Sequence, residues 1–361
     1  MRFLPLLVPA FLCSLAAALT YKGADISSVA IVEGQGVHYT DAGATKAFEK
    51  IIVSHGANTA RIRVWTAGDY NTNYAIAMAK RVKAAGMTLI VDLHYSDTWA
   101  DPGHQAIPAA WPKDLAGLNT QIYKYTNSIV KQFASSGAAI DILQVGNEIN
   151  DGLLWPVGRI SVNGFSGASQ LLHSAVQGAN DAGVSKILLH LANGWDSTGL
   201  QFFFNGIFIQ GALSLNQLSI IGVSFYPFYD AGATLSALKS SLTTLAGKLA
   251  KPIIVAETDW PEACSGVSLT EPSIAVSAAG QETWIKDIKS VLSGLPNGLL
   301  NLCSLLGTWL DRKCGVGIWL LGGSFVSYFR QTTVLTLIFQ DNLVVNSNGA
   351  TRTSINIFKD M

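Results

Sequence analysis

The sequence predicts a (β/α)8 barrel, an α/β fold in which eight parallel strands alternate with helices around one core. Short runs rich in Val, Ile and Leu alternate with helical segments along the whole chain. The 361 residues suit one large domain, and no linker or low-complexity tract divides them. The competing fold is an open, doubly wound sheet. That fold predicts a glycine-rich phosphate loop after the first strand, and the sequence has none there.

The predicted strands are short and mostly apolar, as is typical of strands that are covered on both faces. They span 23–26, 58–65, 88–94, 140–148, 186–190, 218–226, 251–257 and 315–319. The fourth strand ends in Gly146-Asn147-Glu148, and the seventh ends in Glu257. A purely structural strand needs neither the amide nor the two carboxylates, so these two ends indicate a reaction centre.

The predicted helices carry apolar residues at helical spacing. Phe48, Ile51 and Ile52, for example, share one face of the first helix. The helices span 45–55, 74–85, 118–134, 166–182, 235–249 and 281–292. Gly86 and Gly183 follow two of them, where glycine commonly ends a helix.

The first residues predict a secretory signal peptide. Met1 and Arg2 precede an apolar stretch at 3–15 and three small alanines at 16–18, and this segment is too short to span a membrane. We therefore expect residues 1–18 to be removed and residues 19–361 to form one secreted, monomeric domain. Lys+Arg and Asp+Glu are both 24, so the net charge is zero, and neither nucleic acid nor a membrane surface is an expected partner.

The carboxyl ends of barrel strands converge on one mouth, where barrel enzymes have their active sites. The polar residues at the predicted strand ends are Arg61, Arg63, His94, Asn147, Glu148, Tyr226 and Glu257. Two carboxylates across a pocket suit the hydrolysis of glycosidic bonds. A separation of about 5–5.5 Å gives retention and about 6.5–9.5 Å gives inversion, and the sequence leaves both open. The acid of such a pair needs a pKa raised by burial and by its carboxylate neighbour.

The other strand-end residues are expected to support the two glutamates. Arg61 and Arg63 share a strand face, and inside a barrel at least one of them must pair with a carboxylate. Arg61 is the natural cation beside the ionised nucleophile. His94 is expected to support the site without transferring a proton, and Asn147 to bind a sugar hydroxyl. The Tyr226 hydroxyl either donates to the seventh-strand glutamate or lies at the solvated rim.

Two other enzyme chemistries find little support. The sequence has no H-E-x-x-H or C-x-x-C pattern and only six histidines, so we expect no metal and no cofactor. A serine hydrolase would carry G-x-S-x-G, which the nearest segment, at 164–167, does not match.

The strand ends resemble those of the retaining clan A glycoside hydrolases. Seven stretches more closely resemble glycoside hydrolase family fifty-three, the arabinogalactan endo-β-1,4-galactanases, especially secreted fungal members. They are LTYKGADISS (19–28), RIRVW (61–65), DLHYSDTWADP (92–102), GNEI (146–149), GLLWP (152–156), GVSFYPFY (222–229) and VAETDWP (255–261). The resemblance implies that Glu148 is the acid/base and Glu257 the nucleophile of a retaining enzyme, supported by Arg61, His94 and Asn147 as well as Tyr226. It implies internal cleavage of the β-1,4-galactan side chains of pectin.

Aromatic residues of the mouth loops are candidate sugar platforms, because the C–H face of a sugar stacks on an aromatic ring. The expected substrate-binding residues are Trp99, Asp101, Trp155, Trp195, Phe228, Trp260 and Trp319. For each aromatic residue, ordinary packing is the alternative.

The segment 299–340 departs from the family pattern. Leu320-Leu321-Gly322-Gly323-Ser324 stands where the family has Tyr-Trp-Glu, and one permitted codon choice restores Tyr-Trp-Glu-Ala after skipping one base. We hypothesise that the segment derives from intron sequence and a displaced frame; a spliced message that still encodes 320–339 would refute this. Cys264, Cys303 and Cys314 remain after signal removal, and the usual partner of Cys264 in the family would lie in the altered segment.

Two alternatives to a galactanase remain open. One is another clan A endoglycanase that acts on mannan, xylan or glucan. The other is a glycan-binding barrel that has lost activity because its eighth strand is altered.

Overall fold

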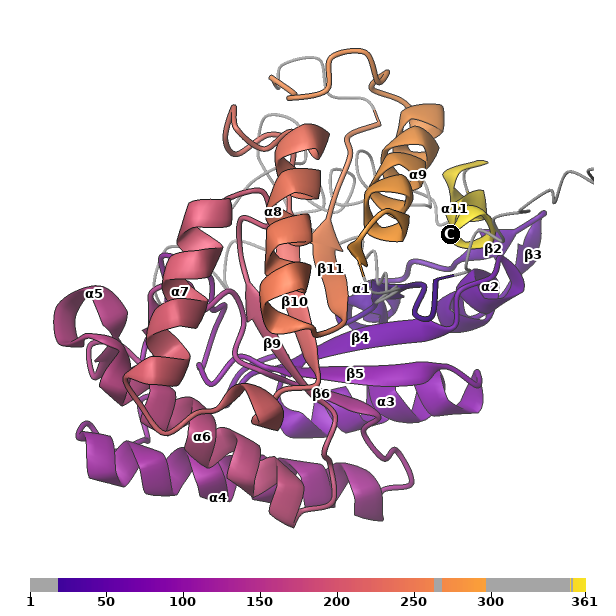
Figure 1. The fold of residues 1–361 in the computed structure, drawn as a ribbon. Helices are drawn as coiled ribbons and strands as arrows, with labels where there is room; N and C mark the ends of the chain where they lie inside the picture. Colours follow the sequence, from indigo (N-terminus) through magenta and orange to yellow (C-terminus); the bar gives the residue numbers. More distant parts are fainter. Residues whose placement is uncertain (1–18, 263–267, 297–350, 352) are drawn as a thin grey trace, which may run out of the picture.

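The computed structural model describes residues 19–262, 268–296, 351 and 353–361 (Figure 1). Within these residues, seven parallel strands form one curled sheet in chain order. They are β1 (Gly23–Asp25), β4 (Thr59–Val64), β5 (Thr88–Leu93), β6 (Ile142–Val145), β9 (Ile187–Leu191), β10 (Ile220–Phe225) and β11 (Ile253–Thr258). Strands that follow each other in the sheet are parallel because each connection crosses over the outer face.

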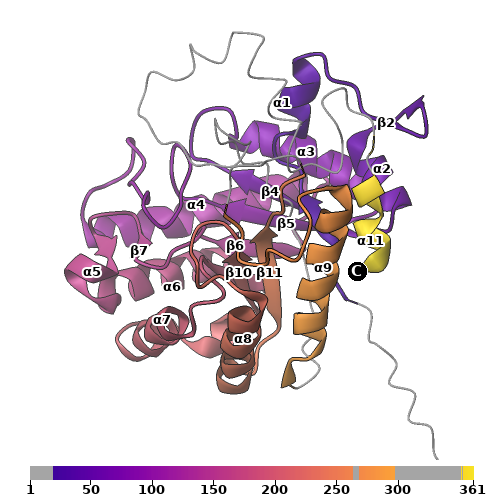
Figure 2. The same cartoon turned by 90° about the horizontal axis from the view of Figure 1, so that it is seen from above.

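Helices lie around the sheet when it is viewed from above (Figure 2), and those between consecutive strands provide the crossovers. They are α1 (Val29–Gly34), α2 (Phe48–Ser54), α3 (Thr72–Ala84), α4 (Leu115–Ser135), α5 (Ile160–Asn163), α6 (Phe165–Asp181), α7 (Ser197–Ile209), α8 (Leu235–Leu249), α9 (Ala278–Ser293) and α11 (Ile357–Asp360). Short elements complete the described chain: the hairpins β2 (Thr40–Asp41)/β3 (Ala44–Thr45) and β7 (Gly152–Leu153)/β8 (Gly158–Arg159), and the 3₁₀ turns η1 (Leu215–Gln217) and η4 (Thr353–Asn356).

This alternation of helices with a curled parallel sheet confirms the predicted (β/α)8 barrel class. The seven strands agree with the first seven predicted ones to within a few residues. The predicted eighth strand (315–319), the signal peptide (1–18), the departing segment (299–340) and the cysteines lie outside the described residues. The helix expected at 45–55 begins three residues later, because Ala44 and Thr45 belong to a hairpin.

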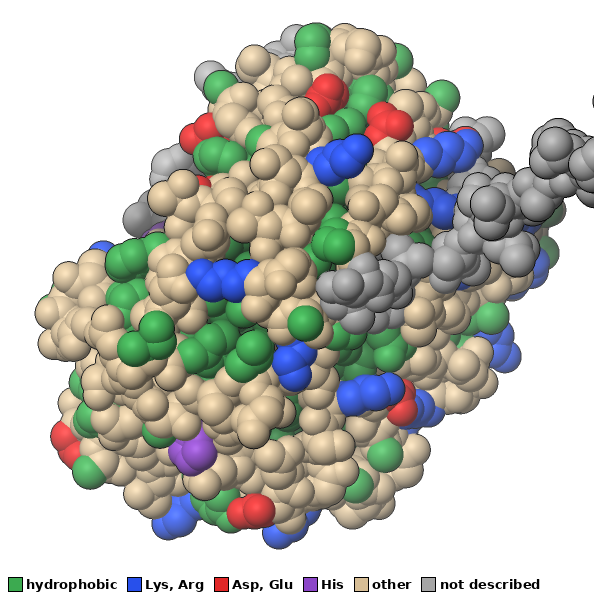
Figure 3. All heavy atoms as spheres, viewed as in Figure 1, with side chains coloured by type: hydrophobic (Ala, Val, Ile, Leu, Met, Phe, Trp, Pro, Cys, Tyr) green, Lys and Arg blue, Asp and Glu red, His purple; other side chains and the backbone are tan. Residues whose placement is uncertain are grey.

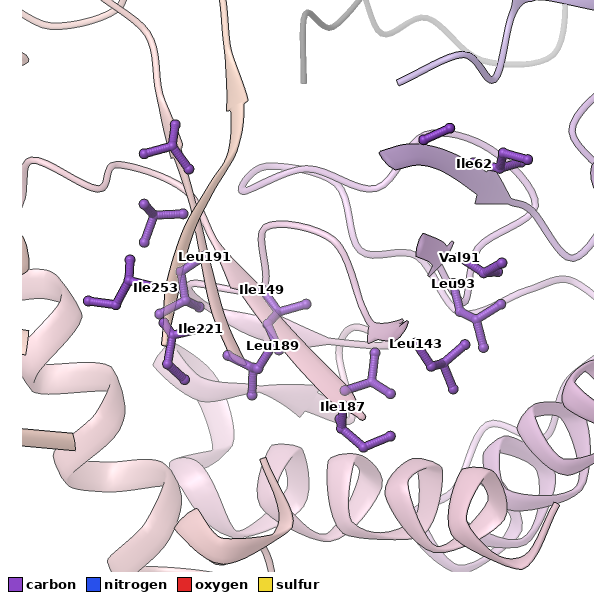
Figure 4. Close-up of a cluster of buried hydrophobic side chains, with 14 of the residues drawn as sticks. Ile62, Val91, Leu93, Leu143, Ile149, Ile187, Leu189, Leu191, Ile221 and Ile253 are labelled. Carbon is purple, nitrogen blue, oxygen red and sulfur yellow. The ribbon is translucent and has the colours of Figure 1, made fainter. Parts of the chain in front are cut away.

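Each strand presents alternate residues to the barrel interior and to the helices. Outward side chains such as Val91, Leu143 and Leu189 pack in the cluster shown in Figure 4, between the sheet and the helices. Inward side chains change character along each strand. At the amino end they form a small apolar layer of Ile90, Ile142, Leu188, Ile220, Ile254 and Ala256. Toward the carboxyl end the inward side chains are polar, and these build the candidate site.

The face of the molecule in Figure 3 shows few charged side chains. On the face of α7 and α8, Lys and Arg lie apart from one another among neutral groups (Figure 3). Among the described helices, none combines the length and the apolar character that crossing a bilayer requires.

Candidate active site

A sharp turn after β6 and a register shift in β11 bring Glu148 and Glu257 into the barrel mouth. Gly146 (φ 83°) and Glu148 (φ 50°) are left-handed, so the chain bends sharply where β6 ends. Non-glycine residues rarely adopt this conformation, and such residues are concentrated at functional sites. In β11 a register shift changes the pairing with β10, from Val223 opposite Val255 to Ser224 opposite Glu257. Without that shift, alternation would point Glu257 outward toward the helices.

Arg61 is the centre of the polar layer. It is 1% exposed, and all five of its N–H groups have acceptors. The acceptors are Gln144 Oε1 (3.0 Å), Asp25 Oδ2 (3.1 Å), Glu257 Oε1 (2.9 Å), Asp92 Oδ2 (2.8 Å) and Asn147 Oδ1 (2.7 Å). The expected pairing of a barrel arginine with carboxylates is therefore present, and one guanidinium links β1, β4, β5, β6 and β11.

Glu257 receives two donors, one charged and one neutral. Arg61 Nη1 donates to Oε1 at 2.9 Å, and the Tyr226 hydroxyl donates to Oε2 at 2.9 Å. Burial, together with the nearby Glu257 carboxylate, raises the pKa of Tyr226 well above its usual value, so this hydroxyl stays protonated. Of the two expectations for Tyr226, the contact with Glu257 is confirmed and the solvated rim position is wrong, because Tyr226 is buried.

Glu148 has a different environment. Its Oε1 lies 2.5 Å from the Ser224 hydroxyl, and among the described residues no cation contacts it. Burial raises the pKa of Glu148 well above its usual value, and the Glu257 carboxylate adds to the effect. Both causes are those that the sequence predicted for the acid of the pair.

Asp92 and His94 support the site from β5 and the loop that follows it. Ala100 N–H donates to His94 Nδ1 at 3.0 Å, so the ring proton sits on Nε2, which lies 2.9 Å from Asp92 Oδ2. Burial alone would raise the pKa of Asp92, but Arg61 and His94 outweigh it and lower this pKa to about 2. His94 thus orients a carboxylate that in turn holds Arg61.

Several residues of this layer were not predicted from the sequence. Asp25, Asp92, Gln144, His190 and Ser224 are buried and connected to the predicted residues. The signal that was available is a polar residue at an inward position of an otherwise apolar strand, as in Thr-Leu-Ile-Val-Asp-Leu (88–93).

The predicted aromatic platforms have different environments. Trp99 and Trp155 are half-buried, and each has a guanidinium near one face: Arg63 at 4.2 Å and Arg159 at 4.1 Å from the respective ring centroid. Trp195 and Phe228 are also half-buried. Trp319 lies outside the described residues.

Trp260 is a correction. Its ring is fully buried, its indole N–H donates to Ala275 O at 2.9 Å, and it packs 5.0 Å from Trp284 of α9. A ring enclosed in this way has no free face for a sugar, so Trp260 is a packing residue.

Asp101 is buried at the mouth and is held by its own loop. Its Oδ1 accepts from Gly103 N–H at 2.7 Å and lies 2.8 Å from His104 Nδ1. Within the described ranges, no group of three or more His, Cys, Asp and Glu side chains is arranged to hold a metal ion.

A barrel mouth with two buried glutamates, one beside an arginine and the other with a raised pKa, is the site of a glycoside hydrolase. Comparison with known proteins narrows this class. The profile of Glycosyl hydrolase family 53 matches residues 21–321, and the chain belongs to that family.

Similar proteins extend over most of the chain. A probable arabinogalactan endo-β-1,4-galactanase A of Neosartorya fischeri is 44% identical over 83% of this chain and 87% of its own length. The arabinogalactan endo-β-1,4-galactanase A of Emericella nidulans is 41% identical, covering 98% and 99%.

Solved structures agree with this placement. A fungal β-1,4-galactanase superposes with a TM-score of 0.84 at 37% identity, covering 95% of this chain and all of the other. The family 53 catalytic domain of Ignisphaera aggregans gives 0.75 at 25% identity, covering 94% and 95%. Xylanase XynB of Paenibacillus barcinonensis gives 0.57 at 13% identity, covering 94% of each chain, which shows a shared fold only.

Proposed function

We propose that this chain is a secreted endo-β-1,4-galactanase that cuts the galactan side chains of type I arabinogalactan with retention of configuration. The observation that carries the proposal is the unequal environment of the two glutamates. Glu257 faces the Arg61 cation, as a nucleophile should, whereas Glu148 has a raised pKa, as an acid should. The names of the similar fungal proteins supply the substrate.

In the first step, Glu257 attacks the anomeric carbon while the glycosidic bond breaks. Glu148 gives its proton to the departing oxygen, and a galactosyl–enzyme ester forms on Glu257. Arg61 and Tyr226 hold the attacking carboxylate in place. Arg61 is held in turn by Asp92, which His94 orients.

In the second step, the ionised Glu148 takes a proton from water, and the oxygen of that water attacks the anomeric carbon. The ester bond to Glu257 breaks, so two inversions give net retention. Asn147 donates one amide hydrogen to Ala100 O at 2.8 Å, and its second hydrogen is proposed to bind the sugar hydroxyl beside the reacting carbon. Such a bond contributes most if it tightens in the transition state.

The remaining assignments belong to the same proposal. Residues 1–18 act as the secretory signal, and residues 19–361 form one catalytic domain that is monomeric in solution. The half-buried aromatic residues and one buried acid bind the polymer outside the reacting sugar. They are Trp99, Asp101, Trp155, Trp195 and Phe228.

The test measures reducing ends released from potato or lupin galactan, with mannan, xylan and β-glucan as competing substrates. We expect release from galactan alone, with internal cleavage and with the β-anomer of the product observed first by NMR. Preference for another polymer would identify a different endoglycanase. A Glu257→Gln variant is the control for the glycan-binding alternative, because equal rates for it and the parent would contradict an enzyme.

A further inference from the structure

We propose that His190 and Ser224 are positioning residues for Glu148, and that the Ser224 hydroxyl serves as a two-position hydrogen bond. When Glu148 is protonated, the hydroxyl accepts from it and donates to His190. When Glu148 is ionised, the hydroxyl turns and donates to the carboxylate. This inference rests on the proposed role of Glu148 as acid and base.

The geometry places one hydroxyl between two partners. Ser224 Oγ lies 2.5 Å from Glu148 Oε1 and 3.0 Å from His190 Nε2. A serine hydroxyl has one hydrogen and two lone pairs, so it donates to only one of these partners at a time. All three side chains are buried, so water does not readily replace either bond.

The orientation of Asn147 fixes which nitrogen of His190 carries the proton. Asn147 Nδ2 donates to Ala100 O at 2.8 Å, and its Oδ1 accepts from Arg61 Nη2 at 2.7 Å. Flipping the amide would bring its NH2 group against the guanidinium. His190 Nδ1 lies 2.9 Å from that same Oδ1, so Nδ1 must be the protonated nitrogen and donate to it.

Gln144 does not change this assignment, although its Nε2 lies 3.1 Å from His190 Nδ1. The two amide hydrogens of Gln144 already have acceptors, Gly146 O at 3.1 Å and Asn147 Oδ1 at 3.2 Å. The contact between Gln144 and His190 is therefore one between two donors.

His190 is neutral well above pH 4, because burial lowers its pKa to about 4. With its single proton on Nδ1, its Nε2 is an acceptor. The Ser224 hydrogen then points to His190, and an oxygen lone pair points to Glu148. This arrangement fits a protonated Glu148, whose O–H donates to Ser224, so the free enzyme retains its acid proton.

When Glu148 loses its proton, its carboxylate needs a hydrogen-bond donor in place of an acceptor. Rotation of the Ser224 hydroxyl supplies that donor without moving a heavy atom. The same pair of residues thus serves both steps of the reaction.

Other charged and titratable groups surround the hydrogen-bonded series Glu148–Ser224–His190. Around Glu148 they are Glu257, Asp101, Arg61, Tyr226 and Tyr229. Around His190 they are Glu257, Arg61, Asp92 and His94. Substitution of His190 leaves all of them in place, and it removes no charge above the pKa of His190.

The test is the pH dependence of kcat/KM on galactan for His190→Phe and His190→Gln. Phenylalanine removes the acceptor, which frees Ser224 to donate to Glu148 permanently and stabilises the ionised form. The basic limb of the kcat/KM profile is the pH range in which activity falls because Glu148 loses its proton. We expect this limb to move to lower pH by about half to one unit, because a hydrogen bond contributes about 1 kcal/mol. Glutamine offers an oxygen to Ser224 and an N–H to Asn147, so its basic limb should stay at the parent pH. The acidic limb should stay in all variants.

A Ser224→Ala background tests whether the effect passes through the hydroxyl. Adding His190→Phe to Ser224→Ala should leave the basic limb where Ser224→Ala alone places it. A further shift in this background, or an unmoved limb in folded His190→Phe, would overturn the inference. His190→Leu, which also lacks the acceptor, replaces the phenylalanine variant if circular dichroism shows that the latter does not fold.

Azide rescue of Glu148→Ala separates this inference from the function on which it rests. Formation of β-galactosyl azide from an activated aryl galactoside shows that Glu148 is the acid/base. If no azide product forms, that role is wrong and the inference falls with it. If the product forms but the basic limbs of His190→Phe and His190→Gln lie at the same pH, the positioning role alone is refuted.

Discussion

The carboxyl ends of β6 and β11 present the same residue type in opposite electrostatic settings. Glu257 of β11 accepts hydrogen bonds from a guanidinium and a tyrosine hydroxyl. Glu148, just after β6, contacts a serine hydroxyl that is itself linked to a neutral histidine. The first setting provides positive charge for a carboxylate, and the second provides groups that are compatible with a protonated acid.

The difference teaches that partners, and not residue type, assign the two roles. Both glutamates are buried to a similar degree, so burial alone does not separate them. Arg61 separates them, because one of its five N–H groups donates to Glu257 and none of them reaches Glu148. Variants that remove one partner at a time test this interpretation.

Glu257→Ala should have the largest effect, because it removes the proposed nucleophile. We expect kcat on galactan to fall by about five orders of magnitude. With azide and an activated aryl galactoside, the small anion should enter the vacated side and give the α-azide. Formation of the β-azide would instead make Glu148 the nucleophile and Glu257 the acid/base.

Glu148→Ala should lower kcat on galactan by about 10²–10⁴-fold, because it removes the proposed acid that protonates the departing sugar oxygen. A dinitrophenyl leaving group does not need that proton. The burst of dinitrophenolate released in the first turnover should therefore survive, and a burst lost to the same extent as galactan hydrolysis would contradict the assignment.

Tyr226→Phe removes one donor from Glu257 and leaves Arg61 in place. We expect kcat to fall by about a hundredfold with a small change in KM, because the lost bond serves a charged group. Tyr123→Phe on the outer face of α4 is the matched control and should behave as the parent. An effect of Tyr226→Phe on KM alone would indicate a sugar-binding role instead.

His190 should make folding stability depend on pH. Its pKa is about 4 in the folded chain and about 6.5 when unfolded, so between these values only the unfolded state binds the proton. The contribution is fully present above pH 6.5 and is lost as the pH falls toward 4. Urea unfolding at pH 7 and pH 4.5 should show a loss of about 2 kcal/mol in the parent that is absent in His190→Gln.

Asp92→Asn, in contrast, should alter the pH dependence of the unfolding free energy only between about pH 4 and pH 2, where Asp92 titrates.

The strands and the two glutamates could be predicted because each signal is local. Apolar runs reveal the strands, and a carboxylate at the end of such a run is conspicuous. The inward direction of Glu257 could not be read from spacing, because it depends on a register shift between β10 and β11. His190 and Ser224 acquire meaning only from partners 43 and 76 positions away along the chain.

Two further differences from the expectations based on sequence concern helix α7 and Trp260. Helix α7 was not predicted, because its sequence Ser-Thr-Gly-Leu-Gln-Phe-Phe-Phe-Asn-Gly-Ile-Phe-Ile is apolar on nearly every side and contains two glycines. Asp196 begins the helix by accepting from Gly199 N–H at 3.0 Å. Trp260 was expected at the mouth, but the packing of α9 against β11 encloses it.

The last described residues pack beside the first part of the chain, where Figure 2 shows α11 next to α2 and α9. Asn356 Oδ1 lies 3.2 Å from His55 Nδ1, a contact that joins residues 301 positions apart, and Ile357 and Phe358 are fully buried. Contacts between such distant residues form only after most of the chain has been made. The region around α2 therefore acquires these contacts only after residues 353–361 have been synthesised. Deletion of residues 353–361 should consequently lower the folding yield, because it removes the buried Ile357 and Phe358 from the core.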